Sequence, residues 1–518
     1  MDLGFGNWPT LQALRNGDRT AFIDAETGAA LTHRDLDRRT NALADALRQR
    51  GVRQGDRVAT LTLNSPQMME ILFATAKVGA IGVPINFRLS APEVRYVLQN
   101  SGASILFASS SLSATASEAA EGTFVREQIA VPTAAERTEG GESAYEQLVA
   151  SGDTHRHEFD ISSDDVCLIM YTSGTTGRPK GAMLTHRNIQ WNVFNSLGFG
   201  AGIGREDITL SAAPLFHIGA LGVHTLPFAY LGACTVIMET FTPDKWLEAA
   251  ERHHITKAFL VPAMWAAIAH SPSLATRDLS ALTFAVSGGA PCPIVVIKAL
   301  QEQGMAFTEG FGMTETAPVA ACLQPEDVID HAGSIGRPVA HMDFRIVDEQ
   351  GHEAPTGQIG ELAVRGPNVF VGYWDNPEAT AEVFRGDWFH TGDLGTVDED
   401  GFYRLVDRLK DMIITGGENV YPIEVEQVIY EHPSVNEVAV VGVPDERWGE
   451  AVVAVVAPTP DSGLDPDELI EWTRARIAHF KAPRRVEIVE QLPRNATGKI
   501  LKRELRRTLG GSTDSVSR

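Results

Sequence analysis

The sequence predicts an α/β protein with a large N-terminal domain and a smaller C-terminal one. Over about 400 residues, short runs rich in Val and Ile alternate with helical stretches, which is the pattern of a parallel sheet with crossover helices. Residues 333–406 differ, because their short strands are interrupted by Gly, Asp and Pro. Beyond Lys410 strands and helices alternate again. We therefore expect layered αβ subdomains and a small β-rich subdomain, followed by an α+β C-terminal domain.

The individual elements follow from local patterns. Continuous apolar or alternating runs predict strands, and proline near the start of an amphipathic stretch predicts a helix. Residues 113–160 are rich in Ala, Ser, Glu and Gly, and we expect surface loop and short helix there. The expected strands are 57–63, 166–171, 258–261, 283–287, 435–443 and 451–457, and the expected helices are 186–195, 243–254, 291–303, 422–431 and 466–479.

Composition narrows the class of protein. The chain has 518 residues, 43% of them hydrophobic and 21% charged, which is typical of a soluble globular protein of about three structural units. Its apolar runs are far shorter than the ~18 residues that span a bilayer. The first residues show no basic segment followed by an apolar core, so we expect a cytoplasmic protein. The four cysteines are widely spaced and predict buried thiols rather than a metal or redox motif.

A formal net charge of −23 argues against a nucleic-acid partner. A small polyanion is not excluded, because salt screens charges beyond about 8–10 Å. Such a ligand would need local donors and a metal ion.

Residues 171–181 contain the most informative stretch, Tyr-Thr-Ser-Gly-Thr-Thr-Gly-Arg-Pro-Lys-Gly. Glycines permit close backbone approach to a ligand, hydroxyls add rotatable donors, and Lys180 adds a charge suited to phosphate. A strand before this stretch and a helix after it would give the usual geometry of a polyphosphate cradle. It is not a Walker loop, because only two residues separate Gly174 from Gly177 and Lys180 is followed by glycine. The alternative is an ordinary surface loop.

This loop resembles the signature of the adenylate-forming enzymes, which include acyl- and aryl-CoA synthetases, nonribosomal adenylation domains and firefly-type luciferases. Further motifs of that family recur in order. They are Glu-Gly-Phe-Gly-Met-Thr-Glu at 309–315, Thr-Gly-Asp at 391–393, Asp-Arg-Leu-Lys at 407–410 with Ile-Thr-Gly-Gly-Glu at 414–418, and Pro-Arg-Asn-Ala-Thr-Gly-Lys at 493–499. Segments 31–36 and 79–86 also look like the family's N-terminal region. The resemblance therefore covers nearly the whole chain.

The resemblance implies an AMP-forming acid–CoA ligase that uses ATP, Mg²⁺ and CoA. Residues 1–407 would bind ATP and the acid and would include a small β-barrel-like subdomain. Residues 408–410, with Lys410 at the centre, would form a hinge. Residues 411–518 would form a mobile C-terminal domain with a disordered tail over 510–518.

The same resemblance assigns the nucleotide site. The phosphates would be held by Thr172, Ser173, Gly174, Thr175, Thr176 and Lys180. The base would lie among Gly288, Gly289, Ala290, Glu309, Gly310, Phe311 and Gly312. The family usually has tyrosine where this chain has Phe311, which keeps the ring and lacks the hydroxyl. Asp393 would accept hydrogen bonds from the ribose hydroxyls, and Arg408 would contact the ribose or phosphates. An aspartate in Thr-Gly-Asp can alternatively be an ordinary turn residue.

The catalytic groups are assigned in the same way. Glu315 would bind Mg²⁺, Thr314 would contact the α-phosphate, and Lys499 would be the catalytic cation. A carboxylate suits a hard cation, and a lysine beside the reacting oxygens stabilises the developing charge. Gly416, Gly417 and Glu418 would approach the pantetheine arm of CoA. His217 would lie between the acyl pocket and the thiol tunnel, although a lone histidine is as often a core residue. The acyl pocket would be lined by His217, Gly219, Ala220, Gly289, Met313 and Ala317.

The substrate class follows from the stretches expected around the acid, 217–222, 286–290 and 313–320. They are apolar and small, and they contain no aspartate for an amino-acid ammonium. We expect a carboxylic acid with an uncharged body, with a medium- or long-chain fatty acid favoured because the pattern looks most like bacterial fatty-acyl-CoA synthetases. An aryl acid stays open. So do transfer to a carrier protein, a homo-oligomer, and a catalytically silent binding protein.

Overall fold

The computed structural model describes residues 3–157, 159–172, 178–198, 200, 202–408, 411–415, 418–445, 447–460, 462–494 and 500–510. It divides into two compact units. Unit 1 comprises Met1–Phe344 and Val364–Phe389, and unit 2 comprises Arg345–Ala363 and His390–Arg518. The predicted α/β architecture is confirmed. The hinge at 408–410 stays a prediction, since residues 409 and 410 lie outside the described part of the chain.

The first sheet of unit 1 has six strands in the order β6-β5-β3-β4-β7-β8. All pairings are parallel except that of β7 with β8. The strands are β3 (Arg57–Leu61), β4 (Ile81–Pro84), β5 (Ile105–Ser109), β6 (Glu127–Val131), β7 (Val166–Thr172) and β8 (Lys180–Thr185). Segment 113–160, expected to be loop and short helix, thus contributes an edge strand, β6, between α5 (Ser113–Ala120) and α7 (Ala144–Ser151). The weak periodicity of that segment hides a strand only five residues long.

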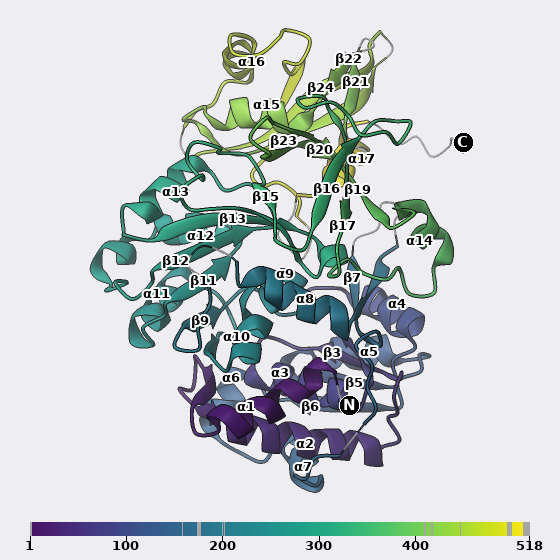
Figure 1. Cartoon of the computed structure of the whole chain (residues 1–518). Coiled ribbons are helices and arrows are strands. Elements are labelled where there is room, and N and C mark those ends of the chain that lie inside the picture. The colour runs from purple at the N-terminus through teal and green to yellow at the C-terminus, as the bar shows by residue number, and fades with distance from the viewer. Residues whose placement is uncertain are drawn as a thin grey trace. The chain divides into compact units, whose positions relative to one another are not determined.

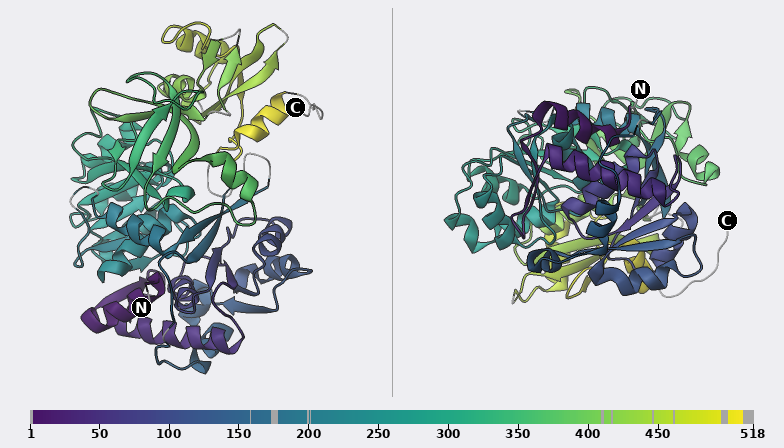
Figure 2. Two further views of the ribbon diagram at one scale, coloured as in Figure 1. Left: turned by 45° about the vertical axis from the view of Figure 1, so that its right-hand side comes forward. Right: turned by 90° about the horizontal axis from the view of Figure 1, so that it is seen from below.

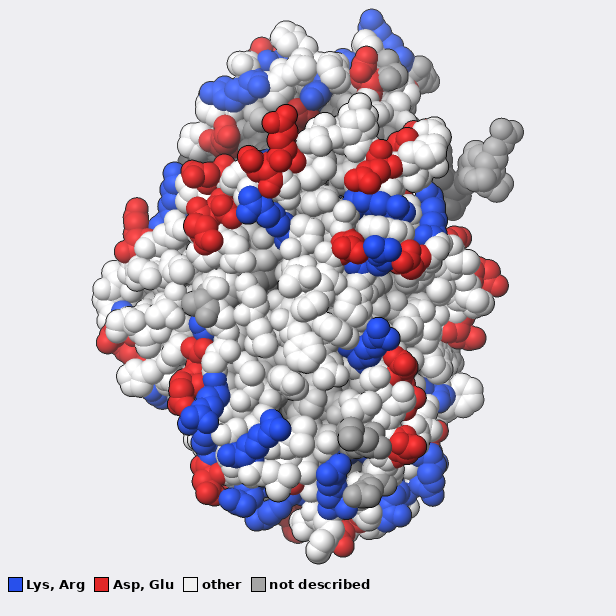
Figure 3. Space-filling view, in the orientation of Figure 1, with Lys and Arg blue, Asp and Glu red and all other residues white. Residues whose placement is uncertain are grey.

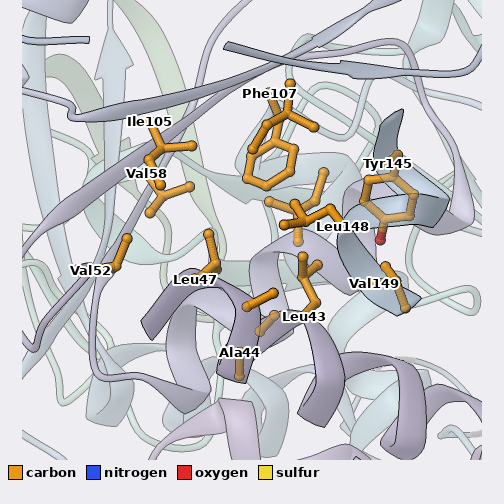
Figure 4. Close-up of a cluster of buried hydrophobic side chains, with 14 of the residues drawn as sticks. Leu43, Ala44, Leu47, Val52, Val58, Ile105, Phe107, Tyr145, Leu148 and Val149 are labelled. Carbon is orange, nitrogen blue, oxygen red and sulfur yellow. The ribbon is translucent and has the colours of Figure 1, made fainter. Parts of the chain in front are cut away.

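Helices cover both faces of this sheet, because successive strand residues point to opposite sides. Ile105 and Phe107 pack in one cluster with α2 (His33–Gln49), α3 (Pro66–Lys77) and α7. Figure 1 shows these helices beside the sheet, and Figure 4 shows Ile105 and Phe107 with the labelled side chains of α2 and α7. Leu106 and Ala108 point the other way, towards α4 (Ala91–Ser101) and α5. The sheet is therefore buried on both faces, as expected for parallel strands joined by helices.

The second sheet of unit 1 has nine strands in the order β15-β14-β13-β12-β11-β9-β10-β1-β2. The pairings from β13 to β1 are parallel, and β14, β15 and β2 are antiparallel additions at the two ends. The strands are β1 (Thr20–Asp24), β2 (Ala30–Thr32), β9 (Ile208–Ser211), β10 (Cys234–Ile237), β11 (Lys257–Leu260), β12 (Phe284–Gly288), β13 (Ala306–Gly312), β14 (Val319–Leu323) and β15 (Arg337–Pro338).

One face of this sheet is important for the site. Phe259, Val286 and Val319 pack there with Val223 of the helical turn η3 (Leu221–Thr225). On the opposite face Phe307 contacts Trp265, which in turn contacts Trp246.

The remaining helices of unit 1 are η1 (Phe5–Asn7), α1 (Trp8–Asn16), η2 (Ser110–Leu112), α6 (Ala134–Glu139), α8 (His186–Ser196), α9 (Ile218–Ala220), α10 (Leu226–Leu231), α11 (Pro243–Arg252), α12 (Pro262–Ala269), η4 (Pro272–Thr276), α13 (Ile294–Gln301), η5 (Thr314–Thr316) and α14 (Pro377–Val383).

A third sheet occupies the β-rich segment. Its order is β16-β17-β19-β18, with β20 paired to β19. The boundaries of the two units fall inside β16, β17 and β19. These strands are β16 (Asp343–Val347), β17 (Gly360–Arg365), β18 (Phe384–Arg385), β19 (Trp388–Val397) and β20 (Tyr403–Arg408).

Unit 2 contains a further sheet, ordered β22-β21-β24-β23 with β25 paired to β24. Helices α15 and α16 pack on one face through Val425 and Leu469, and α17 packs on the other through Leu505. Figure 2 shows α17 as the yellow helix near the end of the chain. The elements are β21 (Ile413–Thr415), β22 (Glu418–Val420), α15 (Pro422–Tyr430), β23 (Val435–Asp445), β24 (Gly449–Pro458), α16 (Pro466–Arg474), β25 (Arg485–Ile488) and α17 (Lys502–Leu509).

The surface carries charged side chains of both signs, as the composition predicts. On the face shown in Figure 3, acidic and basic side chains are interspersed rather than gathered by sign. Among the described residues, no helix has the length and apolar character needed to cross a membrane. The four cysteines are free thiols, three of them buried and Cys234 partly exposed.

A stability prediction concerns Tyr145, whose hydroxyl donates to the Oε2 atom of the buried Glu70 at 2.5 Å, beside Arg39. Because a hydrogen bond to a charged group contributes more than a neutral one, Tyr145→Phe should lower the free energy of unfolding by about 1.5–3 kcal/mol. Urea unfolding followed by circular dichroism measures this. An unchanged unfolding midpoint would contradict the role of the hydroxyl.

Candidate active site

The glycine-rich loop joins two strands, which corrects the expected strand–turn–helix geometry. β7 and β8 pair antiparallel, with Thr172 opposite Lys180, and α8 begins only at His186 after β8 has ended. The apolar run after Gly181 extends the sheet before the chain becomes helical. No helix N-terminus therefore follows the loop directly, and the predicted role of Lys180 in phosphate binding stays a prediction.

Lys180 lies close to a tyrosine from a distant part of the sequence. Its Nζ atom is 5.2 Å from the ring centroid of Tyr373. The Tyr373 hydroxyl donates to the Oε1 atom of Glu315 at 2.9 Å. Residues 371–374 reach this place by pairing along β8, where Met183 donates to the Gly372 carbonyl at 2.9 Å. The structure thus brings together the lysine of the loop and the predicted metal-binding carboxylate.

Glu315 sits on the short helix η5, where its side chain is buried. Its carbonyl accepts the N–H of Phe370 at 2.8 Å, and the Thr316 carbonyl accepts the Asn368 side chain at 2.6 Å. Thr314 is half-buried beside it. A Cβ added to Gly312 would lie 1.7 Å from the Pro318 carbonyl oxygen, so only glycine fits there. The Thr314–Glu315 turn is fixed by backbone contacts on both sides.

The residues expected around the base gather at the ends of two neighbouring parallel strands. Gly288 of β12 pairs with Gly310 of β13, and Phe311 follows as a half-buried ring. Gly289 has a φ of +89°, which favours glycine. Ala290 is exposed after it. This edge, at the carboxyl ends of parallel strands, is where ligands bind in open α/β sheets.

Glu309 has a structural contact within this group. Its Oε1 atom accepts the Cys292 N–H at 2.7 Å, which anchors the loop after β12. Burial raises the pKa of Glu309 to about 7, and the Cys292 N–H opposes that shift.

The predicted acyl-pocket residues lie between the second sheet and α9–η3. At Gly219 an added Cβ would lie 3.4 Å from the Phe259 ring. At Gly222 it would lie 2.4 Å from Pro318, next to Ala317. Ala220 and Ala317 are buried, and Met313 is half-buried. Gly289, also predicted here, ends the Val286 strand at the open edge. Gly219 of α9 therefore faces the Phe259 ring, which packs in one apolar cluster with Val286 of the sheet and Val223 of η3.

His217 immediately precedes α9, next to this group. Its ring lies 4.6 Å from that of Phe216, and its Nε2 atom is buried with no hydrogen-bond partner among the described residues. Burial, assisted by the charge of Arg88, lowers the pKa of His217 to about 4. The imidazole is therefore neutral at physiological pH and is available to one further hydrogen bond.

Three asparagines of α8 hold these segments together. Asn192 donates to the Gly222 carbonyl at 2.7 Å and accepts the Val319 N–H at 2.9 Å. Asn188 donates to the Pro367 and Val369 carbonyls, and Asn195 donates to the Asn368 side chain. Their spacing of four and three residues places them on one helix face.

Unit 2 contains the other predicted residues. Asp393 is buried on β19 opposite Arg408 of β20. Its backbone is held by Thr391, whose hydroxyl accepts the Asp393 N–H at 3.1 Å, and by Glu361, which accepts the Gly392 N–H at 3.2 Å. Glu418 is exposed on β22.

Several predicted residues lie outside the described part of the chain. They are Ser173, Gly174, Thr175, Thr176, Lys410, Gly416, Gly417 and Lys499. Their roles stay predictions.

Sequence reasoning missed Tyr373, Phe259 and the α8 asparagines. The asparagine spacing was a usable signal, because a buried polar row at helical period needs backbone partners. Tyr373 and Phe259 gave no local signal, since their importance depends on strand pairing and sheet facing.

Comparison with known proteins agrees with this arrangement. The family model of AMP-binding enzymes matches residues 10–374, and that of the AMP-binding enzyme C-terminal domain matches residues 424–499. A feruloyl-CoA synthase of an Amycolatopsis species is 45% identical over 98% of this chain and 99% of its own length. An indoleacetate–CoA ligase of Aromatoleum aromaticum is 39% identical (91% and 92%), and a long-chain-fatty-acid–CoA ligase of Mycobacterium tuberculosis is 35% identical (94% and 94%).

Among solved structures, ATP-bound MatB from Rhodopseudomonas palustris aligns with a TM-score of 0.90 at 32% identity, covering 98% of this chain and 99% of that one. The o-succinylbenzoate CoA synthetase of Bacillus subtilis, in complex with its acyl-adenylate intermediate, aligns with a TM-score of 0.85 at 30% identity over 98% and 99%.

The chain belongs to the AMP-binding enzyme family and thus to the adenylate-forming superfamily. The enzyme class predicted from the sequence, an AMP-forming acid–CoA ligase, is confirmed.

A pH prediction follows from Glu309. Its folded-state pKa of about 7 lies above the ordinary value of 4.5, so the folded chain holds an extra proton between these values. Stability from this group is present below pH 4.5 and is lost as the pH rises to 7. Glu309→Gln keeps an acceptor for the Cys292 N–H and cannot ionise. The free energy of unfolding of this variant minus that of wild type should therefore rise by about 2.5 kcal/mol between pH 5 and pH 8.

Urea unfolding of both proteins at the two pH values gives this double difference. The same stability difference at both pH values would show that Glu309 does not titrate in this range.

Proposed function

We propose that this enzyme activates an aryl acid with ATP and transfers the acyl group to CoA. A carboxylate oxygen attacks the α-phosphorus of ATP, which forms the acyl-adenylate and releases pyrophosphate. The CoA thiol then attacks the carbonyl carbon, which releases AMP and a proton and forms the thioester. Both steps bring anions together, so the protein's contribution is positioning and neutralisation of charge.

The described residues fit a magnesium–ATP complex. Glu315 supplies the carboxylate oxygen that Mg²⁺ prefers, oriented by the Tyr373 hydroxyl, and Lys180 lies beside the same tyrosine. Among the described residues, no three His, Cys, Asp or Glu side chains form a metal cluster, so the phosphate oxygens would provide other ligands. Mg²⁺ held there would neutralise charge on the phosphates.

Other roles follow the motifs. The β- and γ-phosphates would be surrounded by Thr172, Ser173, Gly174, Thr175 and Thr176. Thr314 would contact the α-phosphate, and Lys499 would stabilise the reacting oxygens. Asp393 would bind the ribose, and Gly416, Gly417 and Glu418 would approach CoA after rotation about Lys410.

The lining proposed for the acyl pocket supports an aromatic acid. The Phe259 ring lies one methyl group's reach from the Gly219 backbone, so an aromatic ring forms part of this lining. Aromatic rings prefer offset or edge contacts with one another, which this lining offers. The relatives at 45% and 39% identity are named for aromatic acids, whereas the fatty-acid ligase is 35% identical.

A medium- or long-chain fatty acid, favoured by the sequence, is the second candidate. It is supported by the apolar wall of Val223, Val286, Val319 and Phe284, which an alkyl chain could also contact.

The first test measures acid-dependent pyrophosphate release over phenylpropenoic, phenylacetic, octanoic and palmitic acids, each with and without CoA. We expect the phenylpropenoic acids to give the highest kcat/KM and to require CoA for turnover, with acyl-CoA as the product. Higher kcat/KM for the fatty acids would instead establish the second candidate. Pyrophosphate release independent of CoA, with accumulating adenylate, would indicate a carrier protein or another nucleophile as the acceptor.

A second prediction concerns Tyr373. Tyr373→Phe keeps the ring beside Lys180 and removes the hydrogen bond to Glu315. Because that bond orients the proposed metal ligand, apparent affinity for Mg²⁺ should fall roughly 10-fold, as is common for outer hydrogen-bond partners of metal ligands. Titration of pyrophosphate release with Mg²⁺ at saturating ATP measures it. Tyr96→Phe, which loses only a bond to the Pro179 carbonyl, is the matched control. Equal Mg²⁺ dependence in both variants would rule out this role for Tyr373.

A further inference from the structure

Polar side chains line a small cavity beside the apolar wall of the acyl pocket. The cavity has room for roughly one water-sized group. Its lining consists of Thr209, Leu210, Ser211, Ala213, Ala220, His224 and Phe259. Phe259 and Ala220 also belong to the proposed acyl pocket, so the cavity adjoins that pocket between the sheet and η3.

The hydrogen bonds in the lining leave an acceptor for a ligand at Ser211. The Ser211 and Thr225 hydroxyls lie 2.7 Å apart, and Thr225 donates to the Ala220 carbonyl at 2.8 Å. Because the Thr225 proton is used there, the Ser211 hydroxyl donates to Thr225. The Thr225 hydroxyl then donates no hydrogen bond to Ser211 Oγ, whose lone pairs can accept one from a ligand.

His224 provides a second group. Its Nδ1 atom lies 3.1 Å from Thr209 Oγ1. Burial, together with the charge of Lys257, lowers the pKa of His224 to about 3, so the ring is neutral. A neutral imidazole that donates from Nδ1 to Thr209 keeps an acceptor at Nε2. In this tautomer both groups therefore suit a ligand that donates a hydrogen bond.

Strand register gives the depth of this cavity. Thr209 pairs with Lys257, and Lys257 pairs with Phe284, so these three residues lie at the same level of the sheet. Phe284 lies four residues before Gly288, which is at the open edge of the sheet. At about 3.3 Å per residue the Thr209 level lies roughly 13 Å below Gly288, and the Ser211 level, two residues nearer the edge, roughly 7 Å below it. A phenylpropenoic acid has seven bonds between its carboxyl carbon and a para oxygen, about 8 Å at roughly 1.2 Å per bond. With the carboxyl carbon placed level with Gly288, that oxygen would fall between the two levels.

We propose that Thr209, Ser211 and His224 form a subsite that binds the hydroxyl at the far end of a phenolic acid. This rests on the proposed aryl-acid activity and names the class of aryl acid. The hydroxyl donates to Ser211 Oγ or His224 Nε2, and Thr209 positions the imidazole. A long alkyl chain would bring apolar carbon against these groups, which disfavours it.

The test compares kcat/KM for 4-hydroxycinnamic acid and cinnamic acid, which differ only in the hydroxyl. We expect wild type to favour the hydroxylated acid by at least about 10-fold, since a site built to bind a hydroxyl discriminates against the analogue that lacks it. Ser211→Ala and His224→Leu should each lower this ratio severalfold, with the loss on the hydroxylated acid.

Thr235→Val is the matched control. Thr235 pairs with Thr209 on the neighbouring strand, and its buried hydroxyl has no partner among the described residues and does not line the cavity. This variant should keep the wild-type ratio. Circular dichroism checks folding, and if His224→Leu does not fold, Ser211→Ala answers the question alone.

Two failures are distinguishable. If both cinnamic acids are activated but wild type shows no preference, or the variants keep it, the subsite is wrong while the aryl-acid proposal stands. If neither acid is activated and fatty acids are, the proposed function fails and the subsite fails with it.

Discussion

The hydrogen bonds of the α8 asparagines are the interactions on which the rest of the site depends. Buried carbonyl and N–H groups of irregular segments need partners, and a segment that leaves its sheet or helix loses its regular ones. Asn188 and Asn192 supply partners for the backbone around Gly222, Val319 and Pro367, and Asn195 donates to the Asn368 side chain. Because these bonds lie in a low-dielectric interior, breaking one would leave an unsatisfied polar group. A single helix thereby fixes the acyl-pocket wall and the turn that carries Glu315.

The arrangement around β8 brings Lys180 and Tyr373 together without a helix N-terminus. The hairpin of β7 and β8 carries Lys180, and residues 371–374 pair beside it to bring in Tyr373. Strand pairing fixes these two side chains relative to each other, while the Phe370 N–H fixes the Glu315 backbone. Lysine and carboxylate are thus held on regular hydrogen-bonded backbone, and the side chains have little freedom left to lose on binding a ligand.

The proposed acyl pocket would combine an apolar wall with polar groups at its base, and the two would have different physical consequences. The apolar wall formed by Val223, Val286 and Phe259 would exclude water and would favour any acid whose side group is uncharged. Such a wall would therefore discriminate little among these acids. Hydrogen-bonding groups such as Ser211 and His224 discriminate more, because a ligand that cannot pair with them must leave them unsatisfied. Thr209 and Ser211 belong to β9 and His224 belongs to η3, so the proposed subsite is built on other elements than the loop assigned to the phosphates.

The sequence by itself determined the class of fold, the enzyme class and the motifs. The alternation of strands and helices and the motif at 309–315 are local patterns. They can be recognised from neighbouring residues in the sequence alone. It also placed Gly288 and Gly289 at a strand end. Prediction from local pattern failed where the secondary structure of a segment depends on an adjacent strand of the sheet. β6 forms because an open sheet edge was available, and the chain after Gly181 becomes a strand because β7 lies beside it.

Only the tertiary structure brought Tyr373 to Glu315 and the α8 asparagines to their carbonyls. It also placed His224 and Thr209 in one cavity and gave Glu309 its contact with the Cys292 N–H. These pairs are separated by many residues and depend on sheet order and register. The reason is physical, since side-chain chemistry is encoded residue by residue, whereas burial and contact between distant residues arise only when the sheets and helices pack.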